Sequence, residues 1–153
     1  MIKYRLQRAT IKDAKKIKWL IDVHASRQLL LPRSLHDIFE NLRDFYIVRK
    51  NGDVVGCCSL HIVWDDLAEV RSLAIDSKYQ AKGIGTALVK KCLADAKKLG
   101  IQKVFCLTYV PLFFSKLGFK EVPKSELPQK VWGDCIKCSK FPDCNEVPMM
   151  IML

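Results

Sequence analysis

The sequence contains no long apolar run. Its longest apolar runs are short, such as Val54–Leu60, whereas a helix that crosses a bilayer needs roughly 20 apolar residues. The first residues alternate apolar and polar side chains and do not form the apolar core of a signal peptide. We therefore expect a cytoplasmic protein that has no membrane partner.

The sequence also lacks clustered basic residues and any motif typical of nucleic-acid binding. Its formal net charge is +10, but the lysines and arginines are spread along the chain and no run of five occurs. Such a distribution is typical of solvated helix faces and of attraction for a small polyanion. We therefore expect no nucleic-acid partner.

The cysteines lack the pattern of a disulfide-bonded secreted protein. There are seven, and four of them (Cys57, Cys58, Cys92 and Cys106) lie inside apolar stretches, where a free thiol behaves as a small hydrophobic side chain. Because no cysteine is paired in sequence with a plausible histidine base, we expect no covalent catalysis by cysteine.

The residues that are present predict a single α/β domain over residues 1–153, with a cysteine-containing segment at 123–146. The length fits one domain. The predicted order is β-α-α-β-β-β-α-β-α-β-β, which indicates a mixed central sheet with helices on both faces. The strands are predicted at residues 2–8, 45–48, 54–63, 67–75, 104–107, 119–122 and 147–153, and the helices begin near Thr10, Ser34, Gly83 and Pro111.

Short-range signals define several ends of these elements. Thr10 and Asp13 resemble a capping box with Asp in place of Glu, and Ser34 is a typical N-cap residue. Asn51-Gly52 predicts a type I′ hairpin turn, and Gly100 suits the position just after a helix. The apolar stripes expected to be buried are Leu35, Ile38, Phe39 and Leu42 in the second helix and Ile84, Leu88, Cys92 and Leu99 in the third.

The segment 73–86 carries the most informative signal. A buried strand runs into a turn that contains Gly83 and Gly85, and the turn opens an amphipathic helix. Glycines let backbone N–H groups approach a ligand, and a helix start favours an anion, so this segment can hold a pyrophosphate. No Gly-Lys-Ser/Thr follows, which excludes a P-loop, and the third glycine of the dinucleotide fingerprint is missing.

Gln80-Ala81-Lys82-Gly83-Ile84-Gly85 resembles the Gln/Arg-x-x-Gly-x-Gly/Ala signature of the GCN5-related N-acetyltransferases (GNAT family). Residues 73–76 resemble the strand end of that family, and residues 113–119 resemble its Phe-Tyr-x-x-Leu-Gly-Phe helix. The resemblance implies that backbone N–H groups of the loop bind the pyrophosphate of acetyl-CoA, while the strand pairs with its pantetheine arm. The implied cofactor-binding residues are Leu73, Ala74, Ile75, Gln80, Ala81, Lys82, Gly83, Ile84, Gly85 and Thr86.

Three further segments resemble the stand-alone amino-acid N-acetyltransferases of arginine biosynthesis, the N-acetylglutamate synthases. They are residues 30–34, residues 68–75, and a C-terminal block at 127–144. The resemblance implies acetyl transfer to the α-amine of a free amino acid, L-glutamate, as the first step of arginine biosynthesis. Arg33 then binds the α-carboxylate, and Arg71 and Lys130 meet the second carboxylate; the alternative for each is an ordinary surface charge.

Direct transfer needs a neutral amine, and Glu69 is our candidate general base. The alternative is a structural carboxylate that forms an ion pair with Arg71, which lies on the same face of the strand. Relatives carry a tyrosine at the position of Phe114, so no side-chain acid for the leaving thiolate is assigned there. Tyr109 lies nearby in sequence, but it also suits packing at a strand end.

The C-terminal cysteines have a metal-ligand spacing, Cys135-x-x-Cys138 followed by Cys144, yet no histidine occurs after His61. We expect no metal; a structural zinc completed by Asp134, Glu146 or Cys106 is the alternative. Rival functions are an acetyltransferase for another small amine or a protein N-terminus, and a non-catalytic acetyl-CoA sensor. A homodimer is left open.

Overall fold

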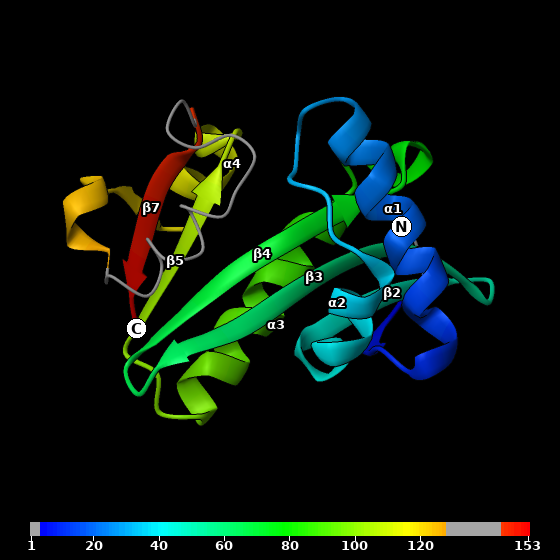
Figure 1. The fold of residues 1–153 in the computed structure, drawn as a ribbon, viewed down its shortest axis with the longest axis horizontal. Helices are drawn as coiled ribbons and strands as arrows, with labels where there is room; N and C mark the ends of the chain where they lie inside the picture. The colour runs from blue at the N-terminus through cyan, green and yellow to red at the C-terminus, as the bar shows by residue number, and fades with distance from the viewer. Residues whose placement is uncertain (1–3, 128–144) are drawn as a thin grey trace.

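The computed structural model describes residues 4–127 and 145–153, and a seven-stranded mixed sheet forms its centre, with strand order β1-β2-β3-β4-β5-β7-β6 (Figure 1). The strands are β1 (Arg5–Arg8), β2 (Phe45–Lys50), β3 (Asp53–Trp64), β4 (Leu67–Ile75), β5 (Lys103–Thr108), β6 (Lys120–Glu121) and β7 (Val147–Met152). The helices are α1 (Ala14–Ser26), α2 (Leu35–Glu40), α3 (Ile84–Lys98) and α4 (Pro111–Lys116). Four short 3₁₀ turns cover Ile11–Asp13, Leu42–Asp44, Ser77–Tyr79 and Lys124–Glu126. The predicted order of elements is confirmed.

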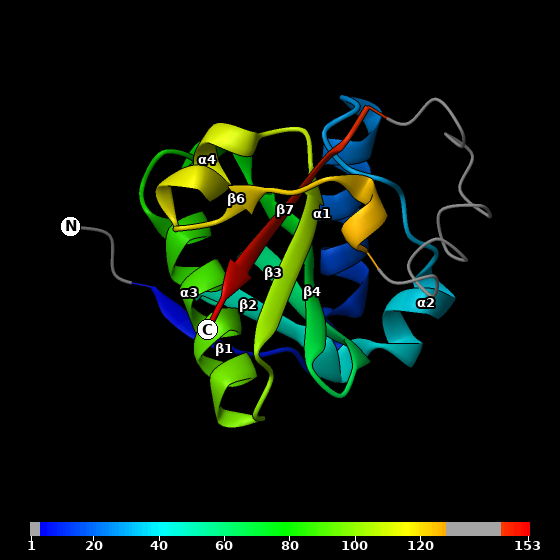
Figure 2. The same cartoon turned by 90° about the vertical axis from the view of Figure 1, so that its left-hand side faces the viewer.

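Helices cover both faces of the sheet, as predicted. Figure 2 shows α3 and α4 on one side of the strands and α1 and α2 on the other. One apolar core lies between α3, α4 and the sheet, and a second lies between α1, α2 and the sheet. Within the described residues, no helix is both long and apolar enough to cross a bilayer.

The predicted turn and cap residues have the expected geometry. Asn51 and Gly52 both have positive φ angles, 51° and 78°, as a type I′ turn requires. The Ser34 hydroxyl accepts a hydrogen bond from the Asp37 N–H at 3.0 Å, which caps α2. Gly100 has a φ of 85° and reverses the chain after α3. These local signals therefore fix the ends of the helices and the β2–β3 hairpin.

Two apolar positions expected in the core are exposed. Phe39 is 40% exposed and Leu99 is 56% exposed. Leu99 lies just after α3, which ends at Lys98, and the reversal at Gly100 brings Ile101 into the core instead. The Ile101 N–H donates to the Ala96 carbonyl at 2.9 Å, a bond that closes this reversal.

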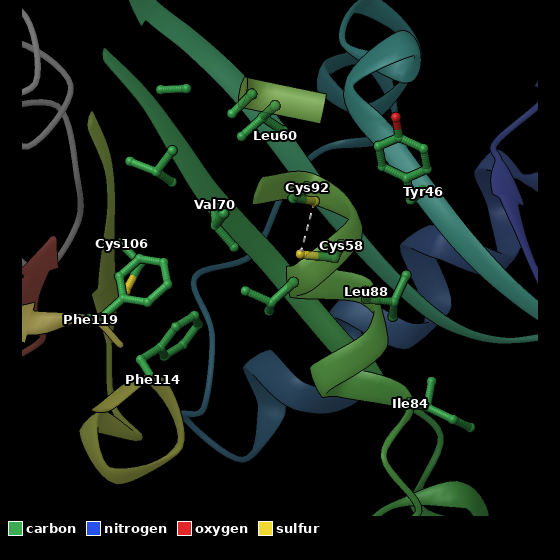
Figure 3. Close-up of a cluster of buried hydrophobic side chains, with 14 of the residues drawn as sticks. Tyr46, Cys58, Leu60, Val70, Ile84, Leu88, Cys92, Cys106, Phe114 and Phe119 are labelled. Carbon is green, nitrogen blue, oxygen red and sulfur yellow. Dashed lines mark hydrogen bonds between the residues drawn. The ribbon is translucent and has the colours of Figure 1, made fainter. Parts of the chain in front are cut away.

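Four cysteines occupy the interior, as their apolar surroundings predict. The Sγ atoms of Cys58 and Cys92 are 3.8 Å apart, between β3 and α3 (Figure 3). Burial raises the pKa of the Cys57 thiol to about 12 and also raises the pKa of Cys106. Burial therefore disfavours the thiolate form of Cys57 and Cys106, the form that acts as a nucleophile.

Asp13 joins the start of the first helical segment to β2, and its loss should destabilise the fold. Its carboxylate is 4% exposed and accepts hydrogen bonds from the Thr10 N–H at 2.8 Å and from Arg49 Nη2 at 2.7 Å. Burial alone would raise the pKa of Asp13, but these bonds outweigh it and hold the pKa below its ordinary value. The resulting stability is present above the pKa of an unfolded carboxyl, about 3.9, and is lost as pH falls through the lower folded pKa.

We expect Asp13→Asn to lower the free energy of unfolding by about 1–3 kcal/mol at pH 7, with a smaller loss in acid. Urea unfolding at both pH values measures the difference. Asp22→Asn is the matched control, because Asp22 forms an exposed ion pair with Lys18 at 2.8 Å, worth under about 1 kcal/mol. Equal effects of the two substitutions would contradict the prediction.

Candidate active site

The strands β4 and β5 part at the centre of the sheet, and the predicted site lies at this fork (Figure 1). In the described part of the chain, they pair in parallel only at Leu67–Lys103, Ala68–Val104 and Glu69–Phe105. From Val70 onward, the edge of β4 on the β5 side has no paired strand among the described residues. Such an edge offers backbone N–H and C=O groups to an extended ligand.

A bulge interrupts β4 just beyond the fork. Arg71 pairs with Ser59 and Ala74 pairs with Cys57, so two β4 residues, Ser72 and Leu73, stand against one residue of β3. Ser72 has a φ of 59°, which is strained for a residue other than glycine. Bulges of this kind change the direction in which neighbouring groups point and are frequent beside active sites.

The glycine loop follows β4 and leads into α3, as predicted. Ala81 and Gly83 have φ angles of 59° and 82°, and α3 begins at Ile84. The Gln80 amide donates to the Ile75 carbonyl at 3.2 Å, which ties the loop to the end of β4. The first N–H groups of a helix have no intrahelical acceptor and attract anions.

The side chains of several predicted cofactor residues face the core and not the site. Ala74, Ile75 and Ile84 are at most 9% exposed and pack in the two cores. These residues can serve a cofactor only through their backbone groups. Residues 80–83 are exposed, and Gly85 and Thr86 are partly exposed at the helix start.

Three of the predicted catalytic and substrate-binding side chains lie together. Arg71 Nη1 is 3.6 Å from Glu69 Oε1 on the same face of β4. Arg33, from the loop before α2, donates from Nε to the Ser72 hydroxyl at 3.3 Å and from Nη1 to Asp37 at 3.1 Å. Burial and the nearby Arg33 both lower the pKa of Arg71, although the carboxylates around it act in the opposite direction. The cluster therefore places two guanidinium groups beside two carboxylates, those of Glu69 and Asp37.

Asp37, Asp44 and His61 belong to this neighbourhood and were not predicted from the sequence. Asp37 holds Arg33, and the charge of Asp44 acts on Arg71. His61 pairs directly with Glu69 across β3 and β4. For Asp37 the sequence does offer a signal. It lies four residues after Arg33 at a predicted helix start, a spacing that allows an ion pair. Lys130, Cys135, Cys138 and Cys144 lie outside the described residues.

Phe114 is a core residue. It is 4% exposed and makes edge-on ring contacts with Phe113 and Phe119, at centroid distances of 5.1 and 5.2 Å. Figure 3 shows Phe114 and Phe119 beside Cys106 in the cluster under β5. A phenyl ring has no acidic hydrogen, so Phe114 cannot protonate the departing CoA thiolate.

A free strand edge, a glycine loop and a cluster of charged side chains are features expected of a protein that binds an extended, anionic cofactor next to a small acceptor. The model of the acetyltransferase (GNAT) family matches residues 10–119. The chain belongs to this family and is an acetyl-CoA-dependent N-acetyltransferase.

Known proteins of similar sequence and structure agree with this class. An uncharacterised N-acetyltransferase of Chlorobaculum tepidum is 38% identical over 145 residues, which cover 95% of this chain and 94% of that protein. An amino-acid acetyltransferase of Mycobacterium tuberculosis is 35% identical over 132 residues, 84% of this chain and 75% of that protein. A crystal structure of a Mycobacterium tuberculosis protein in complex with CoA and NLQ has a TM-score of 0.85 and 30% identity, and the match covers 97% of this chain and 99% of that one.

Proposed function

We propose that the protein transfers the acetyl group of acetyl-CoA to the α-amine of a free amino acid, with L-glutamate as the preferred acceptor. This is the acetylation that opens arginine biosynthesis. The observation that carries the proposal is the placement of Arg33 and Arg71 beside Glu69 at the strand fork. The amino-acid acetyltransferase of Mycobacterium tuberculosis, with 35% identity, supports the acceptor class.

The proposed site assigns one task to each charged group. The loop 80–86 binds the pyrophosphate, and the free edge of β4 pairs with the pantetheine arm, so the thioester lies near the fork. Arg33 binds the α-carboxylate of the acceptor, because a guanidinium group matches a carboxylate with two parallel hydrogen bonds. Arg71 meets the side-chain carboxylate, and Lys130 is proposed to assist it.

Glu69 is the proposed general base. The acceptor ammonium group must lose a proton before its nitrogen attacks the thioester carbonyl, and Glu69 lies where β4 leaves β5. The attack forms a tetrahedral oxyanion whose nitrogen still carries one proton to lose. The departing CoA thiolate takes up that proton, so the products are the amide and CoA thiol. Holding amine and thioester together supplies much of the rate enhancement, and a thiol of pKa near 8.5 is an adequate leaving group.

The acceptor assignment predicts a selective defect in Arg33→Ala. We expect this substitution to raise the KM for glutamate at least about 30-fold, the equivalent of roughly 2 kcal/mol, while the KM for acetyl-CoA changes little. Glutamate should be acetylated faster than glutamine, and agmatine, which lacks the α-carboxylate, hardly at all. Release of CoA thiol across a panel of amines measures all these values.

Arg27→Ala is the matched control, because Arg27 is exposed in the same connection between α1 and α2. It should behave like the parent protein. If Arg33→Ala also behaves like the parent, or if a polyamine reacts faster than glutamate, the amino-acid assignment is wrong and the acetyltransferase class alone stands. If acetyl-CoA binds but no amine promotes thiol release, the protein is a sensor of acetyl-CoA.

A further inference from the structure

His61 and Asp44 form a hydrogen-bonded pair that has no part in the mechanism proposed above. The distance from His61 Nδ1 to Asp44 Oδ2 is 2.7 Å, and both side chains are partly buried. Asp44 ends the 3₁₀ turn that precedes β2, and His61 lies on β3. A carboxylate at this distance accepts a hydrogen bond from the Nδ1–H group, so the Nε2 atom of a neutral imidazole is left as a proton acceptor.

The strand register places His61 next to the proposed base. His61 and Glu69 are direct partners in the antiparallel pairing of β3 and β4. Side chains of direct partners project from the same face with their Cβ atoms about 5 Å apart. An imidazole and a carboxylate can exchange a proton across such a separation, either directly or through one water molecule.

His61 also borders solvent. It lines a surface cavity of about 330 Å³ together with Glu40, Arg43 and Asp44. The charged groups around the imidazole are therefore Glu40, Arg43 and Asp44 on the α2 side and Glu69 and Arg71 on β4. The elements packed around His61 therefore carry three carboxylates and two guanidinium groups.

We propose that His61, held by Asp44, is a positioning residue that relays the proton from Glu69 to water. The inference rests on the proposed role of Glu69. The acceptor ammonium gives one proton to Glu69, whose carboxyl passes it to His61 Nε2; the imidazolium, stabilised by Asp44, releases it into the cavity. Glu69 is then a carboxylate again before the next acceptor binds. The protein therefore ends the cycle with the same number of protons as it began.

The test compares His61→Asn with the parent protein. The asparagine amide keeps a donor for Asp44 but has no titratable nitrogen. We expect kcat to fall about tenfold or more, with added imidazole restoring part of the rate, and with unchanged KM for acetyl-CoA and thermal midpoint. His36→Asn is the matched control, because His36 pairs with Glu40 at 3.0 Å on the exposed face of α2. A normal kcat in His61→Asn that does not depend on the concentration of imidazole would contradict the relay.

Glu69→Gln separates this inference from the proposed function. If the relay acts through Glu69, adding His61→Asn to Glu69→Gln should cause no further loss of kcat. Independent losses that multiply would show that His61 acts by another route, and the relay would be wrong although the acetyltransferase reaction stands.

Discussion

Glu69→Gln should lower kcat by about 10²–10⁴-fold, with little change in affinity for acetyl-CoA. Glutamine has nearly the same shape but cannot accept the proton of the acceptor ammonium. The substitution also removes a charge that lies 3.6 Å from Arg71, so the guanidinium groups become freer to bind a carboxylate. We therefore expect the KM for the acceptor to stay the same or to fall. Steady-state kinetics against both substrates measures this pattern.

The alternative role of Glu69 predicts a different pattern. A carboxylate that serves only as the partner of Arg71 would leave kcat near normal when replaced by glutamine, and would affect acceptor KM or stability instead. Glu121→Gln, on the exposed strand β6, is a neutral control for the loss of one carboxylate. A near-normal kcat in Glu69→Gln would assign the base to water.

Replacing Gly83 by Ala together with Gly85 by Val should abolish binding of acetyl-CoA while the fold survives. Gly83 has a φ of 82°, which alanine adopts only with strain. A Cβ atom at position 85 would lie 3.4 Å from the Phe113 ring, an ordinary contact, so the first added atom causes no clash there. The added atoms instead occupy the space that a pyrophosphate needs against the backbone. Isothermal titration with acetyl-CoA measures the loss.

Gly100→Ala is the control for backbone strain. Gly100 has a φ of 85° with no atom within 4 Å of an added Cβ, as at Gly83, but it lies at the opposite end of α3. Gly100→Ala should lower the free energy of unfolding by about as much as Gly83→Ala does, and should leave the affinity for acetyl-CoA unchanged. Unchanged affinity in a folded double variant at positions 83 and 85 would remove the loop from the cofactor site.

Local sequence signals were sufficient for the fold. Thr10, Ser34, Asn51 and Gly100 act through backbone geometry within a few residues, and each is where its chemistry predicts. The exposure of Leu99 could not be predicted, because an apolar stripe indicates which face of a helix is buried but not the last residue that is buried. Such an end depends on the reversal at Gly100, which lets Ile101 take the core position.

The pairing of His61 with Glu69 could not be predicted from the sequence, because it depends on an irregularity in the pairing of β3 with β4. A two-residue turn at Asp65-Asp66 would pair Ile62 with Glu69 and leave His61 on the other face. An irregularity between Ile62 and Trp64 shifts the register by one residue and places His61 opposite Glu69 instead. Because side chains alternate along a strand, one extra residue exchanges the faces.

The fork between β4 and β5 also leaves the two halves of the sheet joined by a short ladder at its centre. Only three residue pairs join the β1–β4 half to the β5–β7 half among the described residues. In the proposed binding mode the cofactor pairs with the open edge as an added strand, so its binding energy would also stabilise the fold. At a concentration 100 times its Kd, such a ligand contributes about 2.7 kcal/mol to the stability of the native state. We therefore expect saturating acetyl-CoA to slow proteolysis of the native chain.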